Sequence, residues 1–214
     1  MGDASTALAF DSRLWDTVPL FMLLALDVAI LPPRVVVNRA IELSAALPAA
    51  DSQGLRLDDE RVPHITLTQQ FVEVQEIDHV LAKVSATIRN YDTLHLNVTG
   101  PGRGRSSVWM SIAPAPELVE FHRELMDALR PFERREGTTA AFAEGDARPG
   151  DITWVAGFRR TSSYAAFSPH ITLGHSSTLP AVEPLAFDAS TIAACHLGRF
   201  CTCRRVLQRW ELRR

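Results

Sequence analysis

The sequence predicts an α+β fold whose sheets are largely antiparallel. Segments with helical spacing of apolar residues take turns with segments in which apolar and polar residues alternate. Several strand-like segments follow one another closely, as neighbouring strands of a hairpin do. The pentapeptide Pro-His-Ile-Thr-Leu occurs twice, at 63–67 and at 169–173, each time in a strand-like segment. With 214 residues, of which 46% are hydrophobic, the chain suits one domain or two interlocked lobes.

In the first half of the chain, residues 1–18 are expected to form a loose lead-in to a buried strand over Leu20–Val28, which ends at Pro32-Pro33. The apolar run that holds this strand is too short to cross a bilayer and contains Asp27. The elements expected next are a helix over Val35–Leu47, a strand over Val62–Val74, a helix over Ile77–Ile88 and a strand over Leu94–Thr99.

The second half begins with an expected turn at Gly100-Pro101-Gly102 with Gly104. Residues 137–150 are rich in Gly, Ala and Thr and are expected to form a mobile loop. Asp151 is expected to be the N-cap of a short helix that runs to Phe158. The other expected elements are strands over Ser107–Ala113, Ser168–Gly174, Phe187–Leu197 and Val206–Leu212, and a helix over Glu117–Phe132.

Charge and cysteine content exclude several classes of protein. A net charge of −3 argues against coating of long nucleic-acid duplexes, although it is compatible with a small substrate or one end of an RNA. Three cysteines, Cys195, Cys201 and Cys203, are an odd number in one short stretch, so we expect no disulfide framework and a reducing cytoplasm as the compartment. With His196 beside them, their spacing matches no common zinc pattern. We therefore expect no metal, no other cofactor, no membrane partner and a monomer.

The repeated pentapeptide carries the chemistry. Side chains of a strand alternate between its faces, so His64 and Thr66 point to one side while the apolar residues of the motif point to the core, and His170 and Thr172 do the same. Cleavage of a phosphodiester needs a base for the attacking oxygen and an acid for the leaving oxygen, and imidazole serves both near neutral pH. Threonine hydroxyls can donate to the non-bridging oxygens. This pattern predicts a phosphodiesterase that needs no metal.

A single His-x-Thr sequence on a strand is usually structural, but an identical pentapeptide at two positions of a short chain is improbable by chance. The other five histidines have no such partner, and surface or packing roles are expected for them: His79, His95, His122, His175 and His196.

The chain resembles the two-histidine phosphoesterase superfamily, in particular its LigT-like or 2′-5′ RNA ligase branch. The resemblance covers roughly residues 19–212. It rests on the two motif segments, on an opening strand over Phe21–Asp27, on the Val108-Trp109-Met110 strand before a long helix, and on a final strand that ends at Trp210-Glu211-Leu212.

The resemblance implies one bilobal domain over 19–214 with pseudo-two-fold symmetry, in which two small antiparallel sheets flank a central cleft and helices pack outside. By motif order, His64 would be the general acid, His170 the general base on water, and Thr66 and Thr172 would hold the phosphate. The implied reaction is hydrolysis of 2′,3′-cyclic phosphates of nucleotides or RNA ends to 2′-phosphates. The segment from Arg135 to Ala166 is longer than such proteins often have.

Two alternatives remain open from the sequence. Cleavage of 2′-5′-linked or cyclic oligonucleotides would use the same four residues. A non-catalytic nucleotide- or RNA-binding module would keep the cleft, although it would not need the intact His-x-Thr pairs. Six further residues are candidates for nucleotide contacts because they offer rings for stacking or charges for a second phosphate: Phe71, Trp109, Trp154, Tyr164, Arg103 and Arg105.

Overall fold

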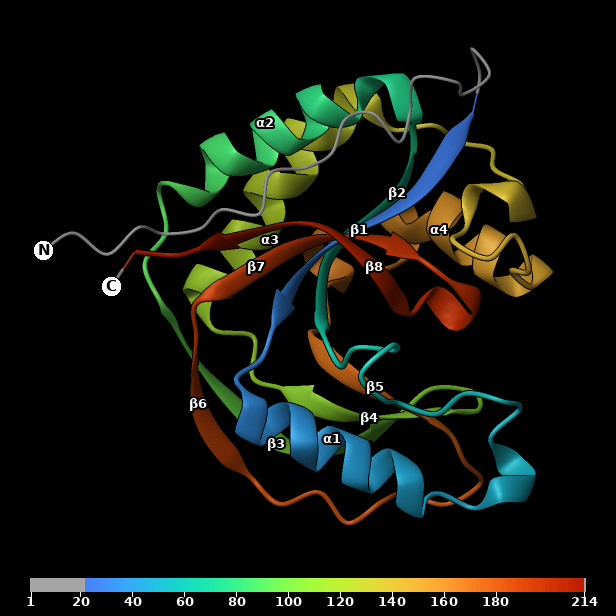
Figure 1. The fold of residues 1–214 in the computed structure, drawn as a ribbon. Coiled ribbons are helices and arrows are strands. Elements are labelled where there is room, and N and C mark those ends of the chain that lie inside the picture. The colour runs from blue at the N-terminus through green and yellow to red at the C-terminus, as the bar shows by residue number, and fades with distance from the viewer. Residues whose placement is uncertain (1–21, 214) are drawn as a thin grey trace, which may run out of the picture.

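The computed structural model of the chain describes residues 22–213 and has two four-stranded antiparallel sheets (Figure 1). The α+β class with two sheets is therefore confirmed. The first sheet consists of β1 (Leu23–Leu31), β2 (Ile65–Glu73), β7 (Thr191–Leu197) and β8 (Cys203–Glu211). The second consists of β3 (Leu94–Arg103), β4 (Ser107–Ile112), β5 (His170–His175) and β6 (Leu185–Ala189).

The two sheets are built on the same plan. Their strand orders are β2-β1-β7-β8 and β5-β4-β3-β6, so each motif strand lies at one edge of its own sheet. The chain completes β1 and β2, builds the whole second sheet, and then returns to the first sheet with β7 and β8. Strands β2 and β5 contact each other where the sheets meet, which brings the two copies of the motif together.

Within residues 22–213, four α-helices cover the sheets. Helix α1 lies against β5 of the second sheet although it follows β1, and α3 lies against β2 of the first sheet although it follows β4 (Figure 1). Each sheet is therefore covered by a helix that follows a strand of the other sheet in the chain. Helix α2 packs beside α3, and α4 packs on β2. The bounds of the helices are Arg34–Ala46 for α1, Ile77–Ile88 for α2, Pro116–Leu129 for α3 and Pro149–Thr161 for α4.

Three expectations about local structure were wrong. The turn predicted at Gly100-Pro101-Gly102 with Gly104 begins only at Gly104, whose N–H donates to the Ser107 carbonyl at 2.9 Å. The three residues Gly100-Pro101-Gly102 lie inside β3, because a β-bulge with Gly100 at φ +144° lets the strand continue to Arg103. The strand expected over Phe187–Leu197 is two strands in different sheets, β6 and β7, which part at Ser190. Asp151 is not the N-cap of α4: Arg148 is, because Pro149 already occupies the first turn.

The N-terminal lead-in over 1–18 and the start of the predicted opening strand lie outside the described residues. The segment 137–150 contains a 3₁₀ turn over Thr139–Ala141 and the start of α4, and it buries Ala141, Phe142 and Ala147 in a small apolar cluster with Phe71. The main core lies between the sheets and helices and includes apolar residues of both motif strands.

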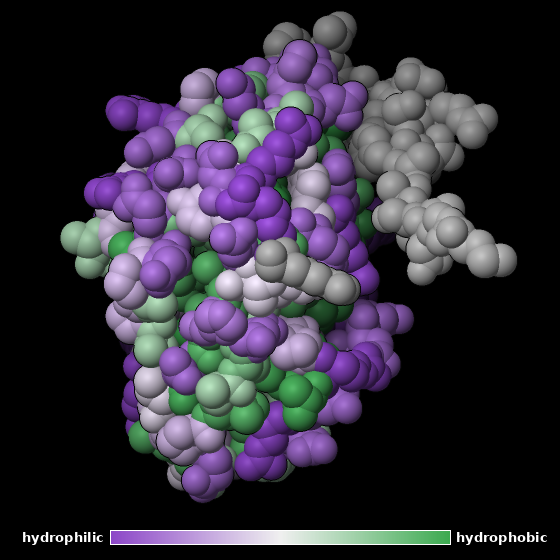
Figure 2. All heavy atoms as spheres, turned by 90° about the vertical axis from the view of Figure 1, so that its left-hand side faces the viewer, coloured by the Kyte–Doolittle hydropathy of each residue, from purple (hydrophilic) through white to green (hydrophobic). Residues whose placement is uncertain are grey.

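One face of the molecule carries both hydrophilic and hydrophobic residues. Hydrophilic residues cover much of it, and hydrophobic residues gather in its lower half (Figure 2). Among the described residues, no helix is both long enough and apolar enough to span a bilayer.

Candidate active site

The two His-x-Thr pairs sit at equivalent places in the two lobes. His64 comes directly before β2, and His170 is the first residue of β5. Both histidines and both threonines are half-buried, whereas the apolar residues of the motif, Ile65, Leu67, Ile171 and Leu173, are all fully buried. The alternation read from the sequence is therefore present in both copies, with the polar pair on the side away from the core.

Strand register extends this equivalence to the backbone. Thr66 pairs with Ala29 of β1, and the next pair joins Thr68 to Val28, so that Leu67 is skipped. Thr172 pairs with Trp109 of β4, and the pairing skips the residue after it in the same way. A β-bulge thus follows the threonine in each motif strand. Bulges bend a strand and redirect its side chains, which gives both His-x-Thr pairs the same local setting.

Both imidazole rings are anchored in the same way, through Nδ1 and a backbone carbonyl. Nδ1 of His64 lies 2.8 Å from the carbonyl oxygen of Val62, and Nδ1 of His170 lies 2.7 Å from that of Ser168. A carbonyl oxygen can only accept a hydrogen bond, so each Nδ1 carries a proton and donates it. Nε2 is then the nitrogen left to take up or give a proton in both rings.

Asp27 of β1 distinguishes the two histidines. Its carboxylate is fully buried, and Oδ2 lies 3.4 Å from Nε2 of His64. The same oxygen accepts hydrogen bonds from Thr66 Oγ1 at 2.9 Å and from Gln69 Nε2 at 2.8 Å. Oδ1 is buried and has no hydrogen-bond partner among the described residues. An opposite charge favours the protonated form of an imidazole, so Asp27 favours a positive His64.

The pKa values of the two imidazoles are consequently shifted in opposite directions. Burial of the His64 ring by itself lowers its pKa, but the hydrogen bond and negative charge of Asp27, with the Val62 carbonyl, outweigh burial and raise that pKa above 6.5. Burial lowers the pKa of His170 below 6.5. The positive charge of His64 lowers it further. The two shifts therefore favour a protonated His64 and a neutral His170.

Trp109 and Gly102 shape the surroundings of His170. The Trp109 ring lies beside the His170 ring, with centroids 4.7 Å apart and planes tilted by 35°. Trp109 pairs with Gly102 of β3, and a Cβ at that glycine would come within 2.0 Å of Trp109 Nε1. Only glycine leaves room for the indole ring to lie across β3 at this point. Of the six candidate nucleotide contacts, Trp109 is the one whose ring packs against a motif histidine.

The two threonines also differ. Thr66 donates its hydroxyl proton to Asp27, so it would have to turn away from Asp27 in order to donate to a substrate. The Thr172 hydroxyl forms no hydrogen bond within residues 22–213 and remains available as a donor.

The other candidate nucleotide contacts lie elsewhere. Phe71 is fully buried against Phe142, which contradicts its predicted role, because the side chain of a central apolar position of β2 has no exposed face. The Tyr164 hydroxyl donates to Asp127 at 2.7 Å, and Arg103 donates to the carbonyls of Ser176 and Ser177. Trp154 is 45% exposed on α4, and Arg105 is exposed in the β3–β4 turn.

One group of potential metal ligands occurs among residues 22–213, namely Asp27, His64 and Cys203, whose ligand atoms lie within 4.8 Å of one another. It offers three ligands, and two hydrogen bonds already occupy Oδ2 of Asp27. The neighbouring His196 donates a hydrogen bond from Nε2 to the Ala141 carbonyl at 2.9 Å. The arrangement is accounted for by hydrogen bonding and by the charge of Asp27.

Sequence reasoning missed Asp27, Gln69 and Gly102. Asp27 was visible as a lone carboxylate within an apolar strand, and a buried charge requires a partner. That signal served only to exclude a membrane span. Gly102 was assigned to a turn, and nothing in a single sequence indicates the indole ring that requires it.

The fold has solved relatives. Escherichia coli LigT in complex with 3′-AMP matches 90% of this chain and 99% of its own, with a TM-score of 0.58 and 19% identity. LigT in complex with NADP+ gives a TM-score of 0.57 at the same identity and coverage. A protein of Thermus thermophilus matches 89% of this chain and 98% of its own, with a TM-score of 0.58 and 15% identity. At these identities, the matches establish the shared fold.

Sequence comparison adds the family. No curated protein is significantly similar to the chain in sequence. The profile of the 2′-5′ RNA ligase superfamily, however, matches residues 39–200, which is well over half of the chain and includes both motifs. On this evidence, together with the LigT-like fold, the chain belongs to the 2′-5′ RNA ligase superfamily of LigT-like phosphoesterases.

Proposed function

We propose that this protein is a metal-independent phosphodiesterase that hydrolyses 2′,3′-cyclic phosphates of nucleotides or RNA ends to 2′-phosphates. The observation that carries the proposal is the unequal histidine pair: two imidazoles with equivalent anchoring, of which only His64 has a buried carboxylate at Nε2. A phosphodiester hydrolysis needs one proton donor and one proton acceptor at the same pH, and this pair supplies both.

In the proposed reaction, Nε2 of His170 removes a proton from water as the water oxygen attacks phosphorus. The bond from phosphorus to the 3′-oxygen breaks, and Nε2 of His64 gives its proton to that oxygen. At 3.4 Å, the hydrogen bond between this nitrogen and Asp27 is long and weak. Asp27 therefore stabilises the imidazolium without withholding its proton. The directions of the two pKa shifts support His64 as acid and His170 as base.

Negative charge collects on the non-bridging oxygens as water attacks, and a donor already in place lowers the barrier. Thr172 is the better placed donor, because its hydroxyl is not committed elsewhere. Thr66 fits a different role, in which it holds Asp27 in position beneath His64. Trp109 fixes the orientation of the His170 ring.

Two other functions use the same site. Cleavage of 2′-5′-linked or cyclic oligonucleotides needs the same acid and base and differs in the surrounding contacts. A nucleotide- or RNA-binding module is a candidate from a different class, and structures of E. coli LigT that contain 3′-AMP, ATP and NADP+ show that a protein of this fold binds nucleotides. Binding alone, however, gives no reason for opposite pKa shifts in two equivalent histidines.

The test is hydrolysis in excess EDTA. We expect turnover of a nucleoside 2′,3′-cyclic phosphate to the 2′-phosphate, identified by chromatography against 2′- and 3′-phosphate standards. A 2′-5′ dinucleotide in the same panel separates the two enzymatic alternatives. Activity that disappears on chelation and returns with a divalent cation would overturn the mechanism, and tight nucleotide binding without turnover would favour the binding module.

A further inference from the structure

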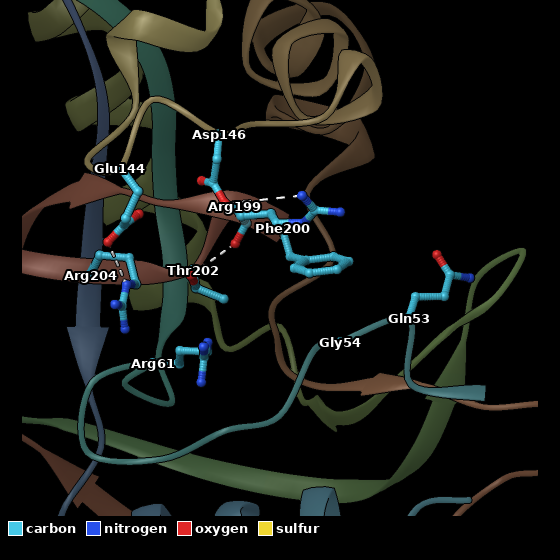
Figure 3. Close-up of a pocket in the computed structure, with 9 residues that line it drawn as sticks. All are labelled: Gln53, Gly54, Arg61, Glu144, Asp146, Arg199, Phe200, Thr202 and Arg204. Atoms are coloured by element: carbon cyan, nitrogen blue, oxygen red, sulfur yellow. Dashed lines mark hydrogen bonds and ion pairs between the residues drawn. The ribbon is translucent and has the colours of Figure 1, made fainter. Parts of the chain in front are cut away.

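A pocket of about 270 Å³ lies next to the segment that leads into β2, is lined by neither motif histidine, and has no part in the proposed chemistry (Figure 3). Its walls come from the segment before β2, from the loop before α4 and from the β7–β8 connection. The lining includes Gln53, Arg61, Glu144, Arg199, Phe200 and Thr202. The volume is close to the lower end of the range for small-molecule sites, about 300–1,000 Å³.

Phe200 is held in this pocket by a strained backbone. Its φ is +64°, and that of Cys201 is +54°, a conformation that costs a non-glycine residue of order 1–3 kcal/mol. The strain is maintained by Asp151, whose Oδ2 accepts the Phe200 N–H at 3.0 Å. Strain of this kind persists where the surrounding structure requires it, and it is concentrated at functional positions. The result is an aromatic ring presented at the pocket wall (Figure 3).

The ring is also fixed in orientation. The Arg148 guanidinium lies 3.8 Å from the centroid of Phe200, and two nitrogens of Arg148 bond the Asp151 carboxylate. Phe200 is only half-buried. One face of the ring is therefore covered by a guanidinium that is itself held in place. The His175 ring, with centroids 5.6 Å apart, and the Arg199 guanidinium, 5.3 Å from the Phe200 centroid, also approach the ring. Because the Arg199 side chain is exposed, a flat ligand can stack on Phe200 once that side chain turns outward.

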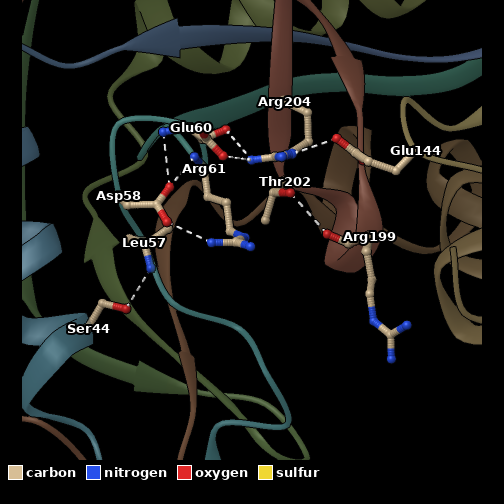
Figure 4. A network of polar contacts seen from close by, with 9 residues as sticks. All are labelled: Ser44, Leu57, Asp58, Glu60, Arg61, Glu144, Arg199, Thr202 and Arg204. Atoms are coloured by element: carbon tan, nitrogen blue, oxygen red, sulfur yellow. Dashed lines mark hydrogen bonds and ion pairs between the residues drawn. The ribbon is translucent and has the colours of Figure 1, made fainter. Parts of the chain in front are cut away.

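Among the arginines that line the pocket, Arg199 has the least compensated charge. Arg204 forms ion pairs with Glu144 at 2.7 Å and with Glu60 at 3.3 Å. Arg61 forms an ion pair with Asp58 at 2.6 Å. Arg199 reaches Asp146 only at 4.0 Å, and its side chain is 47% exposed. In Figure 4 its guanidinium extends away from the network that joins the other residues. Arg199 is thus available to pair with an anion from a ligand.

Backbone hydrogen bonds connect the pocket wall to His64. The Val62 N–H donates to the Cys203 carbonyl at 3.3 Å, and the Val62 carbonyl anchors the His64 ring. Arg61 and Thr202, which line the pocket, are the residues directly before this pair. The pocket therefore adjoins the backbone that positions His64, and Cys203, the residue after Thr202, has its sulfur within 4.8 Å of the nearest ligand atoms of His64 and Asp27.

We propose that this pocket binds the nucleotide that precedes the one carrying the cyclic phosphate. The base of that preceding nucleotide would stack on Phe200, and the phosphate that links the two nucleotides would pair with Arg199. The inference rests on the proposed function and narrows it, because the preferred substrate becomes an oligonucleotide that ends in a cyclic phosphate. A free mononucleoside cyclic phosphate uses only the histidine site.

The test compares adenosine 2′,3′-cyclic phosphate with a dinucleotide of two adenosines that ends in the same cyclic phosphate. Stacking of one base predicts a kcat/KM about tenfold or more higher for the dinucleotide. Phe200→Leu, which keeps an apolar side chain without the ring, and Arg199→Gln should each remove most of that preference. Both should leave turnover of the mononucleotide within about threefold of the wild type. Arg160→Gln, on the exposed surface of α4, is the matched charge control and should change neither value.

Equal kcat/KM for the two substrates in the wild type, or a preference that survives both substitutions, would overturn the subsite. If neither substrate is hydrolysed, the proposed function fails, and calorimetry still decides the subsite. The dinucleotide with a terminal 2′-phosphate should bind the wild type about tenfold more tightly than it binds Phe200→Leu. Equal affinities for the two proteins would exclude the stacking role.

Discussion

Nε2 of His64 lies 3.4 Å from the buried carboxylate of Asp27, whereas the equivalent His170 lies beside the indole ring of Trp109. Two histidines with the same anchor are thereby placed in different electrostatic surroundings. From this asymmetry, more than from the repeat itself, we infer that the two histidines have separate roles.

Replacement of Asp27 by Asn should narrow the pH profile of kcat/KM. The active form needs a protonated His64 and a neutral His170, so the wild type should show its acidic limb below pH 6.5 and its alkaline limb above it. Without the carboxylate, the pKa of His64 falls and the alkaline limb moves to lower pH. Assays from about pH 5 to 9 measure both limbs. An alkaline limb that stays in place in a folded variant would exclude Asp27 as the group that sets it.

His64→Ala and His170→Ala should each lower kcat by about 10²–10⁴-fold, because each removes one proton-transfer group. His79→Ala, at an exposed position of α2, is the matched control and should retain full activity. Circular dichroism and thermal unfolding check that the variants fold. Full activity in either site variant would refute the assignment of the pair.

The threonines should not be equivalent. Thr172→Val removes a free donor and should lower kcat by about 10²-fold or more. Thr66→Val removes a hydrogen bond that buried Asp27 accepts, so we expect the free energy of unfolding to fall by about 1–3 kcal/mol. Its loss of kcat should be smaller than that of Thr172→Val. Steady-state kinetics and urea unfolding of both variants test this difference. Equal losses of kcat would mean that both hydroxyls hold the phosphate.

Gly102→Ala should disturb His170 through Trp109. The added Cβ would lie 2.0 Å from Trp109 Nε1 and 2.6 Å from Ser111 Oγ, so the indole ring must move, at a cost of about 1–3 kcal/mol. We expect a changed tryptophan emission spectrum together with reduced kcat. Gly150→Ala, where a Cβ meets nothing within 4 Å, is the matched control. An unchanged spectrum and rate would show that the ring position is not needed.

The sequence predicted most of the fold because its periodic patterns are local. The helix at Ile77–Ile88 and both motif strands follow from the spacing of their apolar residues. The division at Ser190 could not be predicted, because β6 and β7 are both strand-like and only pairing with different sheets separates them.

The site was predictable only in part, for a similar reason. The motif residues were identified because they repeat, whereas the partners of Asp27 depend on strand register. Phe200 was missed because its exposure depends on backbone strain that Asp151 maintains from another part of the chain. Contacts between distant segments leave no pattern in a single sequence.

The most direct test of the acid–base assignment is an NMR titration of the two imidazoles in the free wild-type protein, with signals assigned by His64→Ala and His170→Ala. We expect a pKa above 6.5 for His64 and below 6.5 for His170. Equal values, or a higher pKa at His170, would contradict it.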